Sequence, residues 1–475
     1  MKRPENIYFL GIGGIGMSAI ARYFIHEGKK VAGYDRTPTP LTAQLETEGA
    51  EIHFEENVEL VPAAFRDPDT TLVVYTPAVP ADHAELVWFR ENGFIVEKRS
   101  EMLGHIAQGK YVMAVAGTHG KTTTTTMVAW LNHVAAEGGR DPRTGHENIG
   151  GAGTGSAFLG GISKNFNSNL VLGDGDRLAV EADEFDRSFL RLFPDAAVIT
   201  STDADHLDIY GTHEAVKEAF SQFAAQIKPG GSLVVKESAE MVRPQGVNVY
   251  TYSFDKETDF HAENIQLLGG GHYRFDIVCP DRVIEGCTLG VPGVVNIENA
   301  VAATALLWVA GFDEERLREG LASFVGVKRR FEFWVNTPEV VYMDDYAHHP
   351  RELSTAIASV KKMFPGRRLT AVFQPHLYTR TRDFHEGFAR ALSMADEVIL
   401  LPIYPAREKP IEGVNSELIA RDVTVPNKVV PKERIVEELE SRKLDVVVTF
   451  GAGDIDAWCE RIAKMIVDKY KIRTQ

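Results

Sequence analysis

The sequence predicts an α/β protein of three domains with mostly parallel sheets. Apolar, strand-like runs recur along the chain, and each run stops at a glycine or polar loop that leads into a helical pattern. That alternation produces parallel sheets. Polar residues gather directly after these runs, where α/β sheets bind ligands. With 475 residues and about 150 per domain, roughly three domains are expected. We expect a Rossmann-like domain at 1–107, a P-loop ATPase-type domain at 108–325 and a Rossmann-like α/β domain at 326–475.

Composition and charge describe a soluble enzyme. Hydrophobic residues make up 44% and charged residues 25%, as in ordinary globular proteins. The net charge of −16 disfavours non-specific binding to nucleic acid. No apolar run approaches the ~20 residues of a membrane span, and the N-terminus lacks a signal-peptide pattern. The three cysteines (Cys279, Cys287 and Cys459) have no metal or redox spacing. We therefore expect a cytoplasmic protein without nucleic-acid or membrane partners.

The first domain begins with a nucleotide-binding pattern. An apolar strand from Asn6 enters a glycine loop, a helix follows to His26, and a second strand at 30–34 ends in Asp35. Glycines at these spacings permit the turn and the close approach of a diphosphate, and the acid suits a ribose hydroxyl. The alternative is a glycine-rich turn without a ligand. The candidate binding residues are Gly11, Gly13, Gly14, Ile15, Gly16 and Asp35, with Thr76 and Ala78 past a later strand.

The second domain opens with a phosphate-binding loop. The apolar run 111–116 stops at Gly117 and leads through a small polar loop to Lys121 and Thr122, where a helix starts. Backbone N–H groups and the helix dipole then point at one place, which suits a phosphate. Lys121 would reach the β/γ-phosphates and Thr122 would ligate Mg²⁺. Val115 stands where the usual P-loop has glycine, and a plain strand-to-helix turn is the alternative. The candidate ATP-binding residues here are Gly117, Thr118, His119, Gly120, Lys121, Thr122 and Thr123.

Two later strands of this domain end in possible metal ligands. The strand that starts at Leu178 ends in carboxylates, and Glu181 is the best-placed partner for a cation on Thr122. The strand 196–201 leads to His206, a possible second metal ligand, although a lone histidine is more often structural. Between the helix and these strands lies a Gly/Asn/Ser-rich run, 138–169, and for 140–155 we expect a flexible surface loop.

Asn296 precedes an expected helix at 300–309. Its side chain could cap that helix or read a purine edge.

In the third domain, polar residues again follow strand ends. Expected strands are 340–343, 369–373, 397–402 and 445–450. His348 and His349, near Asp345, could orient a substrate or simply start a helix. Arg380 and Arg382, expected in one loop, could hold a carboxylate or phosphate, or could be a solvated pair.

Taken together, these motifs resemble the Mur ligase family over essentially the whole chain. The resemblance rests on six stretches: Gly11–Gly16, Gly117–Thr122, Glu181–Glu184, Asp205–Asp208, Gly293–Asn299 and Asp344–Pro350. It implies a UDP-sugar domain, an ATPase domain and an amino-acid-binding domain. It also implies ATP-driven amide formation through an acyl phosphate, with Mg²⁺ or Mn²⁺ on Thr122, Glu181 and His206. The residues expected in a catalytic role are Lys121, Glu181, His206, His348 and Arg380.

Within the family, 373–383 and 344–350 look most like the members that add L-alanine to UDP-N-acetylmuramate. This resemblance implies ATP, UDP-N-acetylmuramate and L-alanine as ligands of a monomer or weak homodimer. Asn296, Arg330 and Asp345 would complete the ATP site, and Tyr346, His348, His376 and Arg380 would line the amino-acid site. Ser221 stands where several sister ligases carry a carbamylated lysine, so none is expected. The alternatives are a ligase that recycles murein tripeptide, an NAD-dependent dehydrogenase, and a regulatory module that binds nucleotides without chemistry.

Overall fold

The computed structural model describes residues 4–136, 154–204, 207–312, 314–406 and 408–472, apart from the side chains of residues 207 and 208. The chain divides into two compact units. The first comprises Met1–Glu263, Asp276–Cys287 and Glu298–Val325, and the second comprises Asn264–Phe275, Thr288–Ile297 and Gly326–Gln475. The predicted bounds of the three domains stay predictions. No helix among the described residues is both long and apolar enough to cross a membrane.

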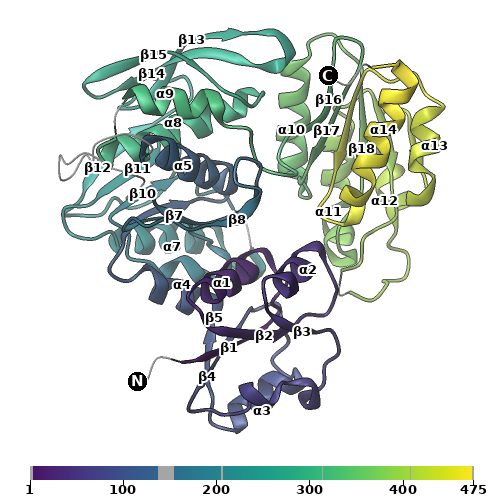
Figure 1. Cartoon of the computed structure of the whole chain (residues 1–475). Coiled ribbons are helices and arrows are strands. Elements are labelled where there is room, and N and C mark those ends of the chain that lie inside the picture. Colours follow the sequence, from purple (N-terminus) through teal and green to yellow (C-terminus); the bar gives the residue numbers. More distant parts are fainter. Residues whose placement is uncertain (1–3, 137–153, 205–206, 313, 407, 473–475) are drawn as a thin grey trace. The chain divides into compact units, whose positions relative to one another are not determined.

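The first unit begins with a five-stranded sheet in the order β3-β2-β1-β4-β5 (Figure 1). All four strand pairs are parallel, and the order is the Rossmann order 3-2-1-4-5, without a sixth strand. Every residue of β1 is buried, because helices cover both faces of such a sheet. The elements are β1 (Asn6–Leu10), α1 (Ile15–His26), β2 (Lys30–Tyr34), α2 (Pro40–Thr47), β3 (Glu51–His53), β4 (Thr71–Tyr75), α3 (Ala84–Glu91), β5 (Ile95–Lys98) and α4 (Arg99–Ala107).

A second sheet has seven strands in the order β12-β11-β10-β6-β9-β7-β8. Its pairs are parallel except for β7 with β8, and β6 lies between β10 and β9. Its elements are β6 (Tyr111–Ala116), α5 (Lys121–Ala136), β7 (Ser156–Ser163), β8 (Ser168–Val171), β9 (Arg177–Glu181), β10 (Ala196–Ile199), α6 (Leu207–Tyr210), α7 (His213–Ala225), β11 (Ser232–Lys236) and β12 (Asn248–Tyr252).

Two strands occupy part of the Gly/Asn/Ser-rich run. No strand was expected there, yet β7 and β8 form one end of the sheet. Gly160 lies in β7 with its α-carbon against Glu181, where a Cβ would be 2.3 Å from the carboxylate oxygen Oε2. Sheet pairing and this close approach explain a glycine inside a strand. Of the loop expected at 140–155, residues 140–153 lie outside the described residues.

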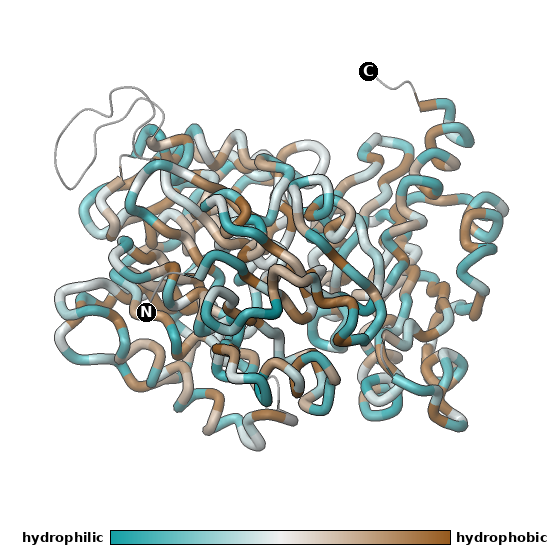
Figure 2. Tube along the Cα trace, turned by 60° about the horizontal axis from the view of Figure 1, so that its bottom comes forward, coloured by the Kyte–Doolittle hydropathy of each residue, from teal (hydrophilic) through white to brown (hydrophobic). Residues whose placement is uncertain are grey.

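One apolar core joins both sheets of the first unit. Residues from β1, α1, α4, β6, β9 and β10 belong to the same buried cluster. Helix α4, expected as a short linking helix, contributes four buried apolar residues: Met102, Leu103, Ile106 and Ala107. Along the trace, apolar stretches alternate with polar turns, as buried strands joined by exposed loops require (Figure 2). The packing of α4 thus ties the first glycine loop and the P-loop to one framework.

The second unit contains a six-stranded sheet in the order β16-β17-β21-β18-β19-β20. All its pairs are parallel except β16 with β17, and apolar clusters cover both faces. Its elements are β16 (Glu332–Asn336), β17 (Val341–Asp345), α10 (Pro350–Met363), β18 (Leu369–Phe373), α11 (Tyr378–Leu392), β19 (Glu397–Leu400), α12 (Ser416–Ala420), β20 (Asn427–Val429), α13 (Ile435–Glu440), β21 (Val446–Phe450) and α14 (Cys459–Tyr470).

Along the sequence, the remaining elements follow the seven-stranded sheet and precede the six-stranded sheet. A three-stranded sheet has the order β13-β14-β15, and helices α8 and α9 follow it. Their bounds are β13 (His261–Leu267), β14 (Tyr273–Cys279), β15 (Arg282–Thr288), α8 (Val294–Val309) and α9 (Glu314–Ser323). Because α8 already begins at Val294, Asn296 lies inside its first turn and is not the cap that the sequence left open.

Candidate active site

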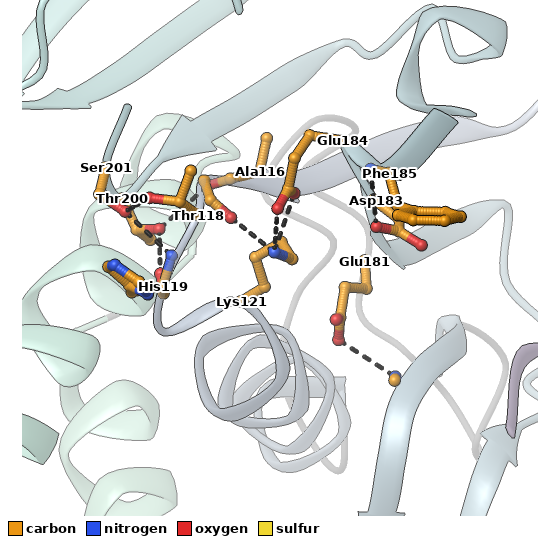
Figure 3. Close-up of polar contacts among 12 residues, drawn as sticks. Ala116, Thr118, His119, Lys121, Glu181, Asp183, Glu184, Phe185, Thr200 and Ser201 are labelled. Atoms are coloured by element: carbon orange, nitrogen blue, oxygen red, sulfur yellow. Dashed lines mark hydrogen bonds and ion pairs between the residues drawn. The ribbon is translucent and has the colours of Figure 1, made fainter. Parts of the chain in front are cut away.

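The predicted phosphate loop joins β6 to α5 in the first unit (Figure 3). Its two glycines have positive φ angles, 134° at Gly117 and 76° at Gly120. A Cβ on Gly117 would lie 2.0 Å from the Thr200 hydroxyl oxygen, so no other residue fits there without displacement. The loop therefore has the tight backbone that a phosphate cradle needs, and Val115, two residues before Gly117, does not prevent it.

The two residues that follow the neighbouring strand β10, Thr200 and Ser201, hold the loop. The Thr200 hydroxyl donates to the carbonyl oxygens of Ala116, at 3.1 Å, and of His119, at 2.5 Å. The Ser201 hydroxyl oxygen accepts from the His119 N–H at 3.0 Å and lies 2.8 Å from the Thr118 hydroxyl (Figure 3). Sequence reasoning missed both residues, because nothing in a single sequence pairs position 119 with positions 200 and 201. The only available signal was their place at a strand end.

Lys121 is buried among carboxylates. Its Nζ donates to the Gly117 carbonyl at 2.7 Å and lies 2.8–2.9 Å from the two carboxylate oxygens of Glu184. Burial lowers the pKa of Lys121, but the carboxylates of Glu184, Asp183 and Glu181 outweigh burial and raise it above its usual value. The ammonium group is therefore charged at neutral pH. It has three N–H donors, so one remains for a phosphate oxygen.

The first turn of α5 offers two oxygens that suit a hard cation. The Thr122 hydroxyl lies 3.1 Å from Glu181 Oε1, and Glu181 Oε2 accepts from the Gly160 N–H at 3.1 Å. A hydroxyl and a carboxylate next to a phosphate cradle are the ligands that Mg²⁺ prefers. His206, the second predicted metal ligand, lies outside the described residues. Within those residues, no group of three His, Cys, Asp or Glu side chains could hold a metal alone. A cation here would need ligands from the nucleotide and water as well.

Two further residues from the sequence motifs, Thr123 and Asn299, flank the same loop. Thr123 follows Thr122 in the first turn of α5 and is half-buried. Asn299, in α8, is buried against Gly120, where a Cβ would lie 2.9 Å from its Oδ1, and it accepts from Thr124 at 3.3 Å. Asn299 belongs to the motif Gly293–Asn299, but the sequence alone indicated no role for it. Its position shows that α8 contributes to the shape of the loop.

The first glycine loop is also built as expected. Gly11 has a φ angle of 85°, and a Cβ there would lie 2.6 Å from a Thr76 methyl carbon. The Asp35 carboxylate accepts from the N–H groups of Gly13, at 2.7 Å, and Thr37, at 3.2 Å. Asp35 therefore shapes the loop; its contact with a ribose stays a prediction.

At the end of that loop, helix α1 has no side-chain cap. Gly14 occupies the N-cap position, is exposed, and precedes Ile15 and Gly16 in the first turn. The first N–H groups of a helix have no partner inside it, so this end can receive an anion. Ala78 is exposed past the end of β4. These positions fit a diphosphate at the loop, which stays a prediction.

In the second unit, two adjacent aspartates organise an arginine-rich turn. Asp345 accepts from the N–H groups of Phe331 and Ala347, each at 2.9 Å. Asp344 pairs with Arg329 at 3.0 Å. Burial raises the pKa of Asp345 to about 6, although the nearby Arg330 opposes this shift. Asp345 thus holds the turn that presents Arg330. Their predicted contact with ATP stays a prediction, as does that of Asn296, whose amide donates to the Pro292 carbonyl at 2.7 Å.

Four predicted amino-acid-binding residues gather in this unit. The ring of His348 lies 5.1 Å from Tyr346 and 6.1 Å from His376, measured between centroids. Burial lowers the pKa of His348, and the positive charges of Arg380 and Arg330 lower it further, against an opposing effect of Glu352. Its Nδ1 lies 3.0 Å from the Tyr346 carbonyl oxygen, which can only accept, so Nδ1 carries the proton. Nε2 of this neutral imidazole is the nitrogen that can accept a proton.

Arg380 and Arg382 do not share a loop. Both lie in the first turns of α11 (Tyr378–Leu392), and residues two apart on a helix do not face each other. Arg382 is exposed and pairs with its neighbour Asp383 at 2.7 Å. Arg380 is partly buried, and its Nη1 has no hydrogen-bond partner among the described residues. The expectation of one shared loop is wrong, and Arg380 alone remains as the candidate anion ligand.

Three family models match the chain in succession. They are the Mur ligase family, catalytic domain, over residues 6–111, the Mur ligase middle domain over 115–307, and the Mur ligase, glutamate ligase domain, over 329–453. The chain belongs to the Mur ligase family. The predicted family and its fold class, three domains of mixed α/β structure with mostly parallel sheets, are thereby confirmed.

Individual Mur ligases match over the full length. A UDP-N-acetylmuramate–L-alanine ligase from Phocaeicola vulgatus is 50% identical over 470 residues, which cover 98% of this chain and 99% of that protein. The crystal structure of a UDP-N-acetylmuramate–alanine ligase from Thermotoga maritima has a TM-score of 0.78 at 28% identity, covering 98% of this chain and 99% of that one. A murein peptide ligase from Psychrobacter arcticus shares the fold, with a TM-score of 0.68 at 22% identity and coverage of 99% and 100%.

Membership of the Mur ligase family decides between the predicted enzyme classes. A dehydrogenase would use the first glycine loop and leave the P-loop, Lys121 and the acidic strand end without a role. In a Mur ligase both loops have one: the first unit contains a diphosphate-type loop and an ATP-type loop joined by a common core. The sequence prediction of a ligase is confirmed, and the dehydrogenase alternative is set aside.

Proposed function

We propose that this Mur ligase joins L-alanine to the lactyl carboxylate of UDP-N-acetylmuramate, with cleavage of ATP to ADP and phosphate, in peptidoglycan precursor synthesis. Two observations together carry the proposal. The chain matches an L-alanine ligase over nearly its full length, and the lysine of its P-loop is charged and paired with the Glu184 carboxylate. The murein-tripeptide alternative is less favoured, because the Phocaeicola vulgatus relative, which is 50% identical, is an L-alanine ligase.

In the first step, the carboxylate of the sugar nucleotide attacks the γ-phosphorus of ATP, and ADP leaves. The N–H groups around Gly117 and Gly120 bind the phosphates, and the Lys121 ammonium neutralises charge on the transferred group. A Mg²⁺ or Mn²⁺ ion on Thr122 and Glu181 would supply further charge neutralisation at the phosphates. Catalysis of phosphoryl transfer is mainly positioning and electrostatics, and these residues provide both.

In the second step, the amine of the amino acid attacks the carbonyl carbon of the acyl phosphate, and phosphate leaves. The amine must first lose a proton, because an ammonium group has no lone pair. His348 is suited to accept it, since its neutral Nε2 is available while Nδ1 donates to the Tyr346 carbonyl. Arg380 is suited to the amino-acid carboxylate, because its Nη1 has no hydrogen-bond partner among the described residues and guanidinium groups bind carboxylates well.

The substrate assignment is tested by measuring ADP release from ATP with UDP-N-acetylmuramate and a panel of amine substrates. The panel is L-alanine, glycine, L-serine, D-glutamate and murein tripeptide. We expect the highest kcat/KM with L-alanine. Turnover confined to D-glutamate or to the tripeptide would overturn the assignment. If the wild-type protein turned over none of these substrates, the result would favour a regulatory module that binds nucleotides without chemistry.

The proposed carboxylate ligand is tested by Arg380→Met. Loss of a charge-assisted, partly buried contact should raise the KM for L-alanine about 10- to 100-fold, with the KM for ATP unchanged. The matched control is Arg382→Met on the same helix, whose guanidinium is exposed and paired with Asp383; it should leave both constants unchanged. Steady-state kinetics with each substrate varied in turn gives the answer. Equal effects of the two substitutions on the KM for L-alanine would contradict the role of Arg380.

The proposed cellular setting is the cytoplasm, where ATP is available. Three free cysteines, all buried, fit that setting (Cys279, Cys287 and Cys459).

A further inference from the structure

Arg99 contacts both the start of α1, at the first glycine loop, and the Asp183 carboxylate past the end of β9. It is the first residue of α4, directly after β5. Its Nη2 lies 3.3 Å from Asp183 Oδ2, and its side chain is only 20% exposed. Its side chain also packs against Gly16: a Cβ on Gly16 would be 3.1 Å from Nη1 and 3.2 Å from Cδ. Gly16 therefore leaves the space that the Arg99 side chain occupies at the start of α1.

The start of helix α1 places further positive charge next to this cation. The start of a helix carries a partial positive charge, and a cation there is repelled. Helix α1 has no side-chain cap to offset that charge. Arg99 nevertheless lies beside its second residue. An anionic group bound there would meet the N–H groups of the first turn on one side and the guanidinium on the other, which would remove the repulsion and use both sets of donors.

Asp183 holds the Nη2 end of the Arg99 guanidinium. This aspartate follows β9, its Oδ1 accepts from the Phe185 N–H at 3.1 Å, and its charge also contributes to the raised pKa of Lys121. The Asp183 carboxylate thus pairs with the guanidinium and also acts electrostatically on the P-loop lysine. One Arg99 N–H group is committed to Asp183, and a guanidinium has five, so others remain for a ligand.

We propose that Arg99 binds the diphosphate of the UDP-sugar, together with the first turn of α1, and that Asp183 positions Arg99 for this contact. The proposal rests on the proposed function, which places a UDP-sugar at the first glycine loop. It adds a residue from outside that loop, and it identifies the diphosphate, rather than the base or the sugar, as the group that Arg99 recognises. No role had been assigned to Arg99 by sequence reasoning, because it lies 83 positions after Gly16.

The test compares UDP with uridine, which lacks the diphosphate. Titration calorimetry on the full chain, with uridine measured by displacement of UDP, gives the two dissociation constants. Arg99→Met should weaken UDP about 10- to 100-fold and leave uridine unchanged. Arg99→Lys keeps the charge but loses the planar fork, so it should lie between the wild-type protein and Arg99→Met. In turnover, the KM for UDP-N-acetylmuramate should rise while the KM for ATP stays constant.

The matched control is Arg191→Met. Arg191 pairs with Glu101 of the same helix α4 at 3.2 Å and is 58% exposed, so its loss should change neither ligand. An unchanged UDP affinity in Arg99→Met would overturn the proposal, and so would equal weakening of UDP and uridine, which indicates a structural role. A wild-type protein that binds UDP no better than uridine would instead contradict the UDP-sugar site itself. ATP binding by each variant shows that the first unit is folded.

Discussion

Replacement of Lys121 by methionine is expected to reduce ADP release at least about 10²- to 10³-fold, the usual cost of removing a donor that stabilises transition-state charge. The Lys121 ammonium lies in the P-loop, 2.7 Å from the Gly117 carbonyl, and has an N–H to spare for a phosphate. Methionine has a similar length and no charge. The measurement is steady-state ADP release with all three substrates at saturation, so that the loss appears in kcat.

The same substitution should also destabilise the protein, for a separate reason. Glu184 is 1% exposed and pairs with Lys121, so Lys121→Met leaves a buried carboxylate without its cation. Breaking such a pair costs about 3–5 kcal/mol of unfolding free energy. The double variant Lys121→Met/Glu184→Gln removes both charges and should regain most of the lost stability. Its activity should stay low, because the missing ammonium is not replaced.

Chemical denaturation and kinetics on the three proteins therefore separate the two roles of Lys121. Recovery of activity in the double variant would show that Lys121 only neutralises Glu184. A single variant as active as the wild-type protein would remove Lys121 from the mechanism. Stability that does not recover in the double variant would mean that the loss has another origin than the broken Lys121–Glu184 ion pair.

Much of this site was predictable because its signals are local. The strand at Tyr111–Ala116, the glycines that follow it and the helix starting with Lys121 are adjacent in sequence, and the strand is entirely apolar or aromatic. Strand β1 and the glycine loop after it were visible for the same reason. In both places, strand burial and the backbone freedom of glycine act within a dozen residues, so one sequence is sufficient to identify them.

Other features depend on contacts between distant parts of the chain. Strand β7 contains Ser156, Gly160 and Ser163, and it is a strand because it pairs with β8 and β9. Tertiary pairing of this kind overrides weak local propensity. Glu184 is 63 positions from Lys121, which a single sequence does not reveal as a contact.

The misplacement of Arg382 has a conformational cause. Helix α11 begins one residue after Leu377, which has a φ angle of 72°. Few residues other than glycine adopt such an angle, so the sequence indicated a longer loop there. The Leu377 N–H donates to the Tyr404 carbonyl at 3.0 Å, and the Leu377 carbonyl accepts from the Thr381 hydroxyl at 2.8 Å. These bonds hold the strained turn and start the helix early.

Replacement of Gly117 by alanine is the second substitution with a large expected effect. The φ angle of 134° is unfavourable for alanine, and the new Cβ would lie 2.0 Å from the Thr200 hydroxyl oxygen and 2.8–2.9 Å from the backbone nitrogens of Ser201 and Thr200. The loop must move to accept it. Because misplacement of catalytic groups by about 1 Å can cost about 100-fold in rate, kcat/KM for ATP should fall by at least that factor. Strain and overpacking together should cost about 2–5 kcal/mol of unfolding free energy.

The control for Gly117→Ala is Gly109→Ala in the turn before β6. Gly109 also has a positive φ angle, 77°, but a Cβ there would meet nothing within 4 Å. It should lose only about 1–2 kcal/mol of stability from the left-handed backbone and keep its activity. Adding Thr200→Ala to Gly117→Ala should not restore the loop. The substitution removes the hydroxyl, but the backbone nitrogens of Thr200 and Ser201 still lie within 3 Å of the new Cβ. Rescue by Thr200→Ala would show that the contact with the Thr200 side chain, and not the backbone of Thr200 and Ser201, requires glycine at position 117.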